Sequence, residues 1–159
     1  MARVVEGKDH VDFPLPHPDR AEDRLRRLFA AALAAADPYQ AVQDALPPRP
    51  AGRVLLVGAG KASARMAQAV EAAWGPQEGF VVVPEGGVLP LEGIEVAEAA
   101  HPVPDVRSEA AGRRILRLAE GLGEGDLALC LISGGGSSLM AVPGGDLTLA
   151  DKQAVNRAL

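Results

Sequence analysis

The sequence predicts a three-layer α/β/α fold built around a largely parallel, Rossmann-like sheet. Short apolar runs alternate with segments whose apolar residues recur at helical spacing, which is the pattern of βαβ units. Two of the apolar runs end in glycine-rich turns. The 159 residues are 48% hydrophobic but only 3% aromatic, so we expect a core of Ala, Val and Leu side chains.

Proline, glycine and capping residues separate the expected elements. Asp37-Pro38 stops the first helix, and Gly75-Pro76 ends a later one. In order, we expect an extended arm over 1–18, a helix over 19–36, a short helix over Tyr39–Leu46, a strand over Arg53–Val57, a helix over Lys61–Trp74, strands over Gly79–Val83 and Ile94–Ala99, a helix over Val106–Gly121, a strand over Leu127–Ile132 and a helix from Thr148 onward.

The run Leu127–Ile132 is the most informative stretch. Six consecutive apolar residues predict a central parallel strand that is buried on both faces. Glycines let backbone N–H groups approach a ligand, and serine hydroxyls can bond phosphate or carboxylate oxygens. We therefore predict an anion site at the carboxyl end of this strand, with a ligand-free tight turn as the alternative. Its candidate residues are Ser133, Gly134, Gly135, Gly136, Ser137 and Ser138.

A second glycine turn precedes one of the expected helices and is followed by Lys61. The first N–H groups of a helix are unpaired and its dipole favours negative charge, so Gly58 and Gly60 are candidate anion-binding residues. Lys61 is a candidate to neutralise charge during phosphate transfer. The alternative is an ordinary solvent-exposed lysine at the start of a helix.

Two familiar phosphate-binding templates nearly fit this turn. A P-loop needs a glycine where Leu55 stands and a hydroxyl where Ala62 stands. The dinucleotide fingerprint needs Gly or Ala where Ser63 stands. Glu85, after the second strand, is nevertheless a candidate ribose ligand, so a dehydrogenase remains open.

Other features exclude whole classes of protein. The net charge of −5 argues against nucleic-acid binding, and no apolar run approaches the roughly 18 residues of a membrane span. The single cysteine, Cys130, cannot form an internal disulfide; we expect it in the core and the protein in the cytoplasm.

No spacing of His, Cys and Asp predicts a protein-bound metal. Leu139 breaks the nucleophile elbow around Ser137, which argues against a hydrolase.

Four motifs in order resemble the amino-terminal part of the glycerate 2-kinase family, whose members also carry the names hydroxypyruvate reductase and tartrate-degradation protein. The resemblance spans roughly residues 20–159. The motifs are Gly58-Ala59-Gly60-Lys61-Ala62, His101-Pro102-Val103-Pro104-Asp105, Ser133-Gly134-Gly135-Gly136-Ser137-Ser138-Leu139, and the helix that runs from Leu147-Thr148-Leu149 to Asn156.

The resemblance implies ATP-dependent phosphorylation of the 2-hydroxyl of D-glycerate to give 2-phosphoglycerate, with Mg²⁺ arriving on the nucleotide. It implies two domains with the active site between them, so residues 19–159 would be a truncated amino-terminal domain, inactive alone. Lys61 takes the catalytic role, and the triple-glycine loop binds nucleotide or substrate. His101 and Asp105 are candidate substrate-side residues, with turn packing as the alternative for His101.

Several questions stay open at this point. The last helix reaches Leu159 without a stop signal, which favours the front part of a longer protein, and its apolar positions favour a homo-oligomer. An NAD(P)H-dependent hydroxypyruvate reductase and a non-catalytic phospholigand-binding domain remain alternatives to the kinase. The sequence does not assign ATP and glycerate to one glycine loop or the other.

Overall fold

The structure is a computed structural model that describes residues 18–158. The chain divides into two compact units, Met1–Ala36 and Asp37–Leu159. The arm expected over 1–18 lies outside the described residues, except that the first helix already begins at Pro18.

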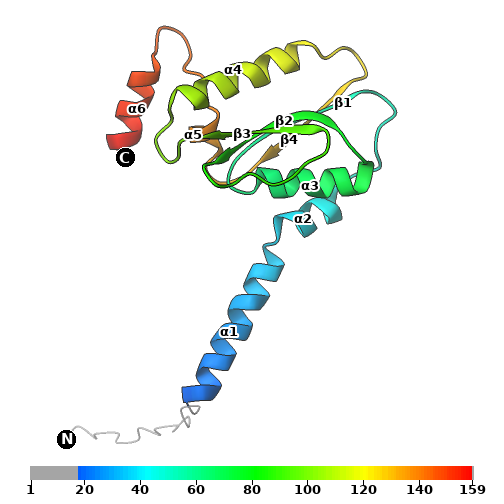
Figure 1. The fold of residues 1–159 in the computed structure, drawn as a ribbon, viewed down its shortest axis with the longest axis vertical. Coiled ribbons are helices and arrows are strands. Elements are labelled where there is room, and N and C mark those ends of the chain that lie inside the picture. The colour runs from blue at the N-terminus through cyan, green and yellow to red at the C-terminus, as the bar shows by residue number, and fades with distance from the viewer. Residues whose placement is uncertain (1–17, 159) are drawn as a thin grey trace, which may run out of the picture. The chain divides into compact units, whose positions relative to one another are not determined.

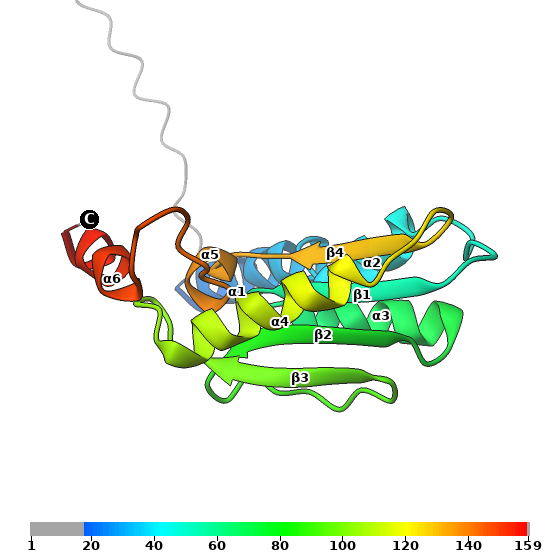
Figure 2. The same ribbon diagram turned by 90° about the horizontal axis from the view of Figure 1, so that it is seen from above.

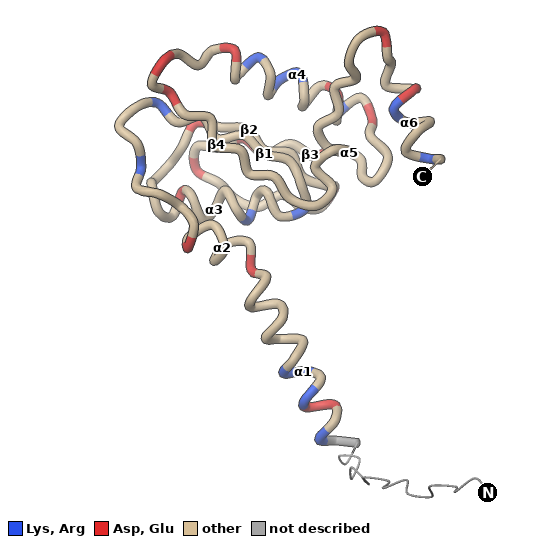
Figure 3. The backbone as a smooth tube through the Cα atoms, turned by 180° about the vertical axis from the view of Figure 1, so that it is seen from behind, with Lys and Arg blue, Asp and Glu red and all other residues tan. Residues whose placement is uncertain are grey.

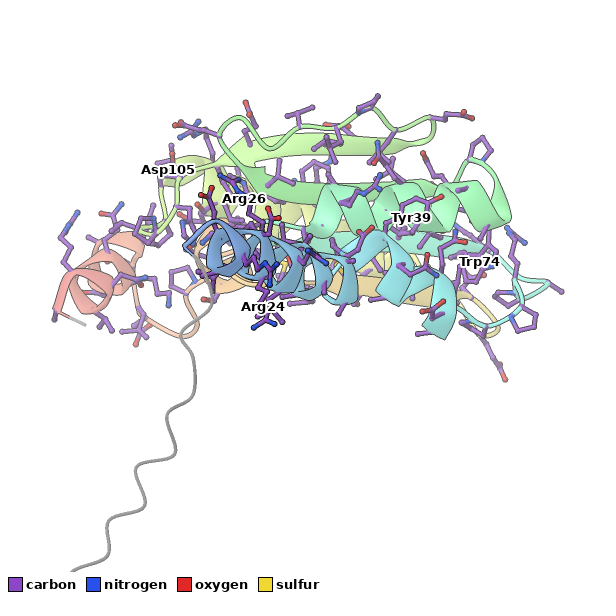
Figure 4. All side chains as sticks on the ribbon, turned by 90° about the horizontal axis from the view of Figure 1, so that it is seen from below. Arg24, Arg26, Tyr39, Trp74 and Asp105 are labelled. Carbon is purple, nitrogen blue, oxygen red and sulfur yellow. The ribbon has the colours of Figure 1, made fainter. Side chains whose placement is uncertain are left out.

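The described part of the first unit is α1 (Pro18–Ala35), which confirms the first expected helix. Leu25, Leu28 and Phe29 follow one another at helical spacing and form an apolar stripe along it. On α1, where Figure 4 labels Arg24 and Arg26, the guanidinium of Arg26 pairs with Glu22 over 2.6 Å. Both partners are exposed, so this pair adds little to stability.

The second unit contains one four-stranded sheet in which every neighbouring pair is parallel. The strands lie side by side in the order β3-β2-β1-β4, as Figure 2 shows. They are β1 (Val54–Ala59), β2 (Glu78–Pro84), β3 (Ile94–Ala99) and β4 (Leu127–Ile132). The chain builds the sheet outward from β1 to β3 and then returns to place β4 on the other side of β1. The strand order therefore reverses between β1 and β4, and ligands of open α/β sheets bind at this kind of position.

Helices cover both faces of the sheet, which confirms the three-layer prediction. The lower layer in Figure 1 holds α2 (Pro38–Ala45) and α3 (Ser63–Trp74), and the upper layer holds α4 (Val106–Glu120). The core accordingly has two parts. Leu56, Val70 and Val81 are buried on the α3 side, and Leu55, Phe80 and Val82 on the α4 side.

No helix links β2 to β3. Residues 85–93 return beside α3 instead, and the Glu71 carboxylate accepts the N–H groups of Glu92 and Gly93, each over 2.8 Å. These hydrogen bonds hold the connection against α3, whereas the longer connection between most parallel strands contains a helix that packs on the sheet.

The prediction that β4 is central and buried on both faces is wrong for this structure. β4 is an edge strand, in which Leu131 is buried while Ile132 remains 52% exposed. Cys130 is also exposed, so its expected place in the core is wrong too. The reason is that α4 packs over β1, β2 and β3 and leaves one face of β4 uncovered. An apolar run indicates that a strand is suited to burial, but it does not indicate the position of the strand in the sheet.

Candidate functional site

Three loops meet at the carboxyl edge of the sheet. They follow β1, β3 and β4, and they contain the three glycine or proline motifs of the sequence. The loops after β1 and β4 are joined directly: the Lys61 N–H donates to the Gly134 carbonyl and the Ala62 N–H donates to Ser133 Oγ, each over 3.0 Å. The two predicted anion-binding turns therefore form one site, at the point where the strand order reverses.

Gly60 permits this contact between the two loops. Its φ of +143° is a conformation that side chains disfavour, and a Cβ there would stand 2.7 Å from the Ser133 carbonyl oxygen. Its N–H donates to the Val82 carbonyl over 3.0 Å, which ties the turn to β2 as well. Gly60 is thus a position where the backbones are too close for any side chain.

Gly58 has a different place from the one expected. β1 continues through Gly58 and Ala59, so the predicted loop over 58–60 is reduced to its last residue. A Cβ on Gly58 would stand 2.6 Å from the Leu131 carbonyl oxygen, so this glycine permits the close pairing of β1 with β4. Its assignment to ligand binding stays a prediction.

His101 and Lys61 approach each other across Gly135. Gly135 has a φ of +91°, and a Cβ on it would stand 2.8 Å from His101 Nε2 and 3.8 Å from Lys61 Cγ. His101 is half-buried and Lys61 is exposed. The structure therefore brings together one residue from each of the three motifs.

The triple-glycine loop offers free donors. Within the described residues, the N–H groups of Gly134 and Gly135 make no hydrogen bond. Gly136 begins the short helix α5 (Gly136–Leu139), and Ser138 Oγ donates inward to the Gly135 carbonyl over 2.9 Å. Ser137 is exposed. Unpaired N–H groups beside a lysine are suited to binding an anion.

The charge of this site comes from its loops. Neither β1 nor β4 carries Lys, Arg, Asp or Glu, as Figure 3 shows along the backbone. Lys61 therefore supplies a positive charge directly at the junction of the two glycine loops. Among the described residues, no three His, Cys, Asp or Glu side chains gather closely enough to hold a metal ion.

Asp105 caps α4. Its carboxylate accepts the N–H groups of Arg107 and Ser108 over 3.0 and 3.1 Å, and Arg107 Nε donates to it over 2.7 Å. Partial burial acts to raise the pKa of the Asp105 carboxyl, but the hydrogen bonds from Arg107 and Ser108 outweigh it and hold this pKa below the usual value. Figure 4 shows Asp105 at the end of this unit opposite to Trp74. Its role toward a substrate stays a prediction.

Sequence reasoning missed the structural role of Ser63. Its Oγ donates to the Leu131 carbonyl over 2.9 Å, and the side chain is fully buried. This bond fixes the start of α3 to β4 directly below the site. A small hydroxyl residue that departs from the dinucleotide fingerprint is the one signal that pointed to this position.

Fold and site together define a doubly wound α/β protein whose candidate anion-binding loops lie at the reversal of strand order. Residues 24–159 match a family described as a domain of unknown function, DUF4147, and the chain belongs to this family. The motif resemblance to the glycerate 2-kinase family is confirmed, because relatives from two organisms bear that name and others are named glycerate kinase.

The D-glycerate 2-kinase of Thermotoga maritima is 40% identical over 145 residues, which are 89% of this chain and 35% of the relative. A protein of Agrobacterium vitis, provisionally named hydroxypyruvate reductase, is 54% identical over 87% of this chain and 32% of its own length. The crystal structure of glycerate kinase from Thermotoga maritima superposes with a TM-score of 0.78 at 36% identity, over 89% of this chain and 35% of that one. This chain thus spans about a third of the length of these relatives. Within residues 18–158, no helix is both long and apolar enough to cross a membrane.

Proposed function

We propose that this chain is the amino-terminal part of a glycerate 2-kinase, which transfers a phosphoryl group from ATP to the 2-hydroxyl of D-glycerate. The observation that carries the proposal is the meeting of Lys61, His101 and the unpaired N–H groups of Gly134 and Gly135 at the reversal of strand order. The names of the relatives at 34–40% identity support the same reaction.

Phosphoryl transfer asks a protein mainly for positioning and charge stabilisation. The ammonium group of Lys61 is suited to stabilise the negative charge that develops during transfer. The Gly134 and Gly135 N–H groups are suited to orient phosphate or carboxylate oxygens. His101 borders the same space and is suited to contact the hydroxyl end of the substrate.

The residues present fit a nucleotide with its magnesium ion. Within the described residues the N–H groups of Gly134 and Gly135 make no hydrogen bond, and Lys61 offsets phosphate charge. When bound, ATP with Mg²⁺ supplies the phosphoryl group that is transferred. We propose that the ion arrives with the nucleotide, because phosphates and water supply most of its ligands in sites of this kind.

A hydroxypyruvate reductase is the second candidate, because the relative at 54% identity carries that provisional name. A reductase of the Rossmann type would use Glu85 to bind the ribose of its nicotinamide cofactor. In this structure the Glu85 carboxylate accepts from Arg107 over 2.7 Å, so ribose binding there would have to compete with an ion pair.

The test compares both reactions on one preparation of the full-length protein. We expect release of ADP that depends on D-glycerate, and a product that enolase converts directly, since enolase acts on the 2-phosphate and not on the 3-phosphate. Oxidation of NADH or NADPH with hydroxypyruvate, without release of ADP, would refute the kinase proposal. The Lys61→Ala variant serves as the control for contaminating kinases.

A further inference from the structure

The helix α6 (Leu149–Ala158) reaches the His101 loop through two side-chain amides. Gln153 Nε2 donates to the Pro104 carbonyl over 2.8 Å, and Asn156 Nδ2 donates to the Pro102 carbonyl over 3.3 Å. The two residues are three positions apart and therefore lie on the same face of the helix. α6 buries none of its residues, so these bonds are specific links rather than by-products of packing.

The start of α6 is stabilised by hydrogen bonds within its own first turn. The Thr148 N–H donates to Asp151 Oδ2 over 2.8 Å, and the Asp151 N–H donates to Thr148 Oγ1 over 3.2 Å, which is a reciprocal cap. Gln153 and Asn156 thus extend from a helix whose first turn is already stabilised.

The His101 loop, which these two amides contact, has few backbone hydrogen-bond donors. Pro102 and Pro104 have no N–H group, so their carbonyls are the polar groups through which other elements can hold them. The Pro104 side chain is fully buried. The ring of His101, at the start of this loop, packs against Gly135. Any shift of the two carbonyls would therefore move His101 relative to the triple-glycine loop and Lys61.

We propose that Gln153 and Asn156 are positioning residues: they hold the Pro102 and Pro104 carbonyls and thereby set the His101 ring against Gly135. Neutral amides suit this role, because they donate hydrogen bonds without adding a charge beside an anion site. What the site binds rests on the proposed function, but the positioning itself depends only on these contacts.

Isosteric variants test the two bonds. Gln153→Glu and Asn156→Asp replace the donating NH₂ by an acceptor that repels the carbonyl, with almost no change of shape. Gln153→Lys keeps a donor. Gln43→Glu is the matched control, because Gln43 Nε2 donates in the same manner to the Ala69 carbonyl over 2.9 Å, between α2 and α3.

The first measurement is NMR of the 159-residue chain, following the imidazole Cε1–H signal of His101 and the amide signal of Gly135. We expect both signals to move in Gln153→Glu and in Asn156→Asp, to stay in place in Gln43→Glu, and to return toward wild type in Gln153→Lys. Unmoved His101 and Gly135 signals in the two carboxylate variants would overturn the proposal, whatever reaction the protein catalyses.

The second measurement is steady-state kinetics of the full-length protein. We expect Gln153→Glu to lower kcat/KM for D-glycerate about tenfold, the scale of a small misplacement of a positioning group, with Gln153→Lys within about threefold of wild type. Full activity in a variant whose His101 signal has moved would overturn the positioning role. If wild type itself lacks kinase activity, the proposed function fails, and the NMR result alone decides the geometry.

Discussion

Gly60→Ala tests the close contact on which the site is built. Alanine at a φ of +143° carries a backbone strain of about 1–3 kcal/mol. Its Cβ would stand 2.7 Å from the Ser133 carbonyl oxygen, which belongs to backbone and cannot swing away as a side chain can. Forcing the loops apart adds about 1–3 kcal/mol, as overpacking does elsewhere. We therefore expect a loss of about 2–6 kcal/mol, a large share of the roughly 5–15 kcal/mol that stabilises a domain.

The assay is urea unfolding of the 159-residue chain, followed by circular dichroism. With a denaturant slope of about 2 kcal/mol per M, the midpoint should fall by at least about 1 M. Gly134→Ala is the matched control in the opposing loop, because a Cβ there meets nothing within 4 Å and the residue has no positive φ. We expect it to stay within about 0.5 kcal/mol of wild type. Equal midpoints for the two variants would refute the reasoning about Gly60.

Three further predictions concern single side chains. Lys61→Ala in the full-length protein should lower the turnover of the proposed kinase at least about a hundredfold, with little change of thermal midpoint; a change of only a few-fold would mean that Lys61 is an ordinary surface lysine. Asp105→Ala should cost about 1 kcal/mol at pH 7 through loss of the helix cap. Because the folded pKa of Asp105 is lowered, this stability is present above the usual pKa of 3.8 and is lost as the pH falls through the lower folded value. In urea unfolding, the difference in unfolding free energy between wild type and Asp105→Ala should therefore be smaller at pH 3 than at pH 7. An equal difference at both pH values would contradict the role of the Asp105 carboxylate as the helix cap. Cys130 should react with a thiol reagent in the native state as fast as in urea, whereas a core cysteine would wait for unfolding.

Local order was accessible from the sequence alone. Strands β3 (Ile94–Ala99) and β4 (Leu127–Ile132) begin and end where they were predicted, and α4 ends one residue before its predicted end at Gly121. These boundaries depend on apolar periodicity, on glycine and proline, and on caps such as Asp105. All of these act between residues that are close in sequence, so the sequence carries them directly.

The two glycine turns were also recognisable in the sequence, because glycines directly after an apolar run are typical of a tight turn at the end of a strand. The contact between the two turns could not be predicted. Nothing in the local pattern says that the Lys61 N–H meets the Gly134 carbonyl, or that Ser63 bonds to Leu131, because these pairs form only after β1 and β4 have become neighbours. The hydrogen bonds from the side-chain amides of α6 to the His101 loop join residues about fifty positions apart. The sequence does not predict them, for the same reason.

The sequence by itself therefore determined the alternation of strands and helices, the parallel sheet and the motifs that mark the family. Only the tertiary structure decided the strand order, and with it the edge position of β4, the exposure of Cys130 and the place where three loops meet. Local elements follow from short-range sterics and hydrogen bonds. Strand order follows from how whole layers cover one another, and the apolar run Leu127–Ile132 would read the same at the centre of a sheet as at its edge.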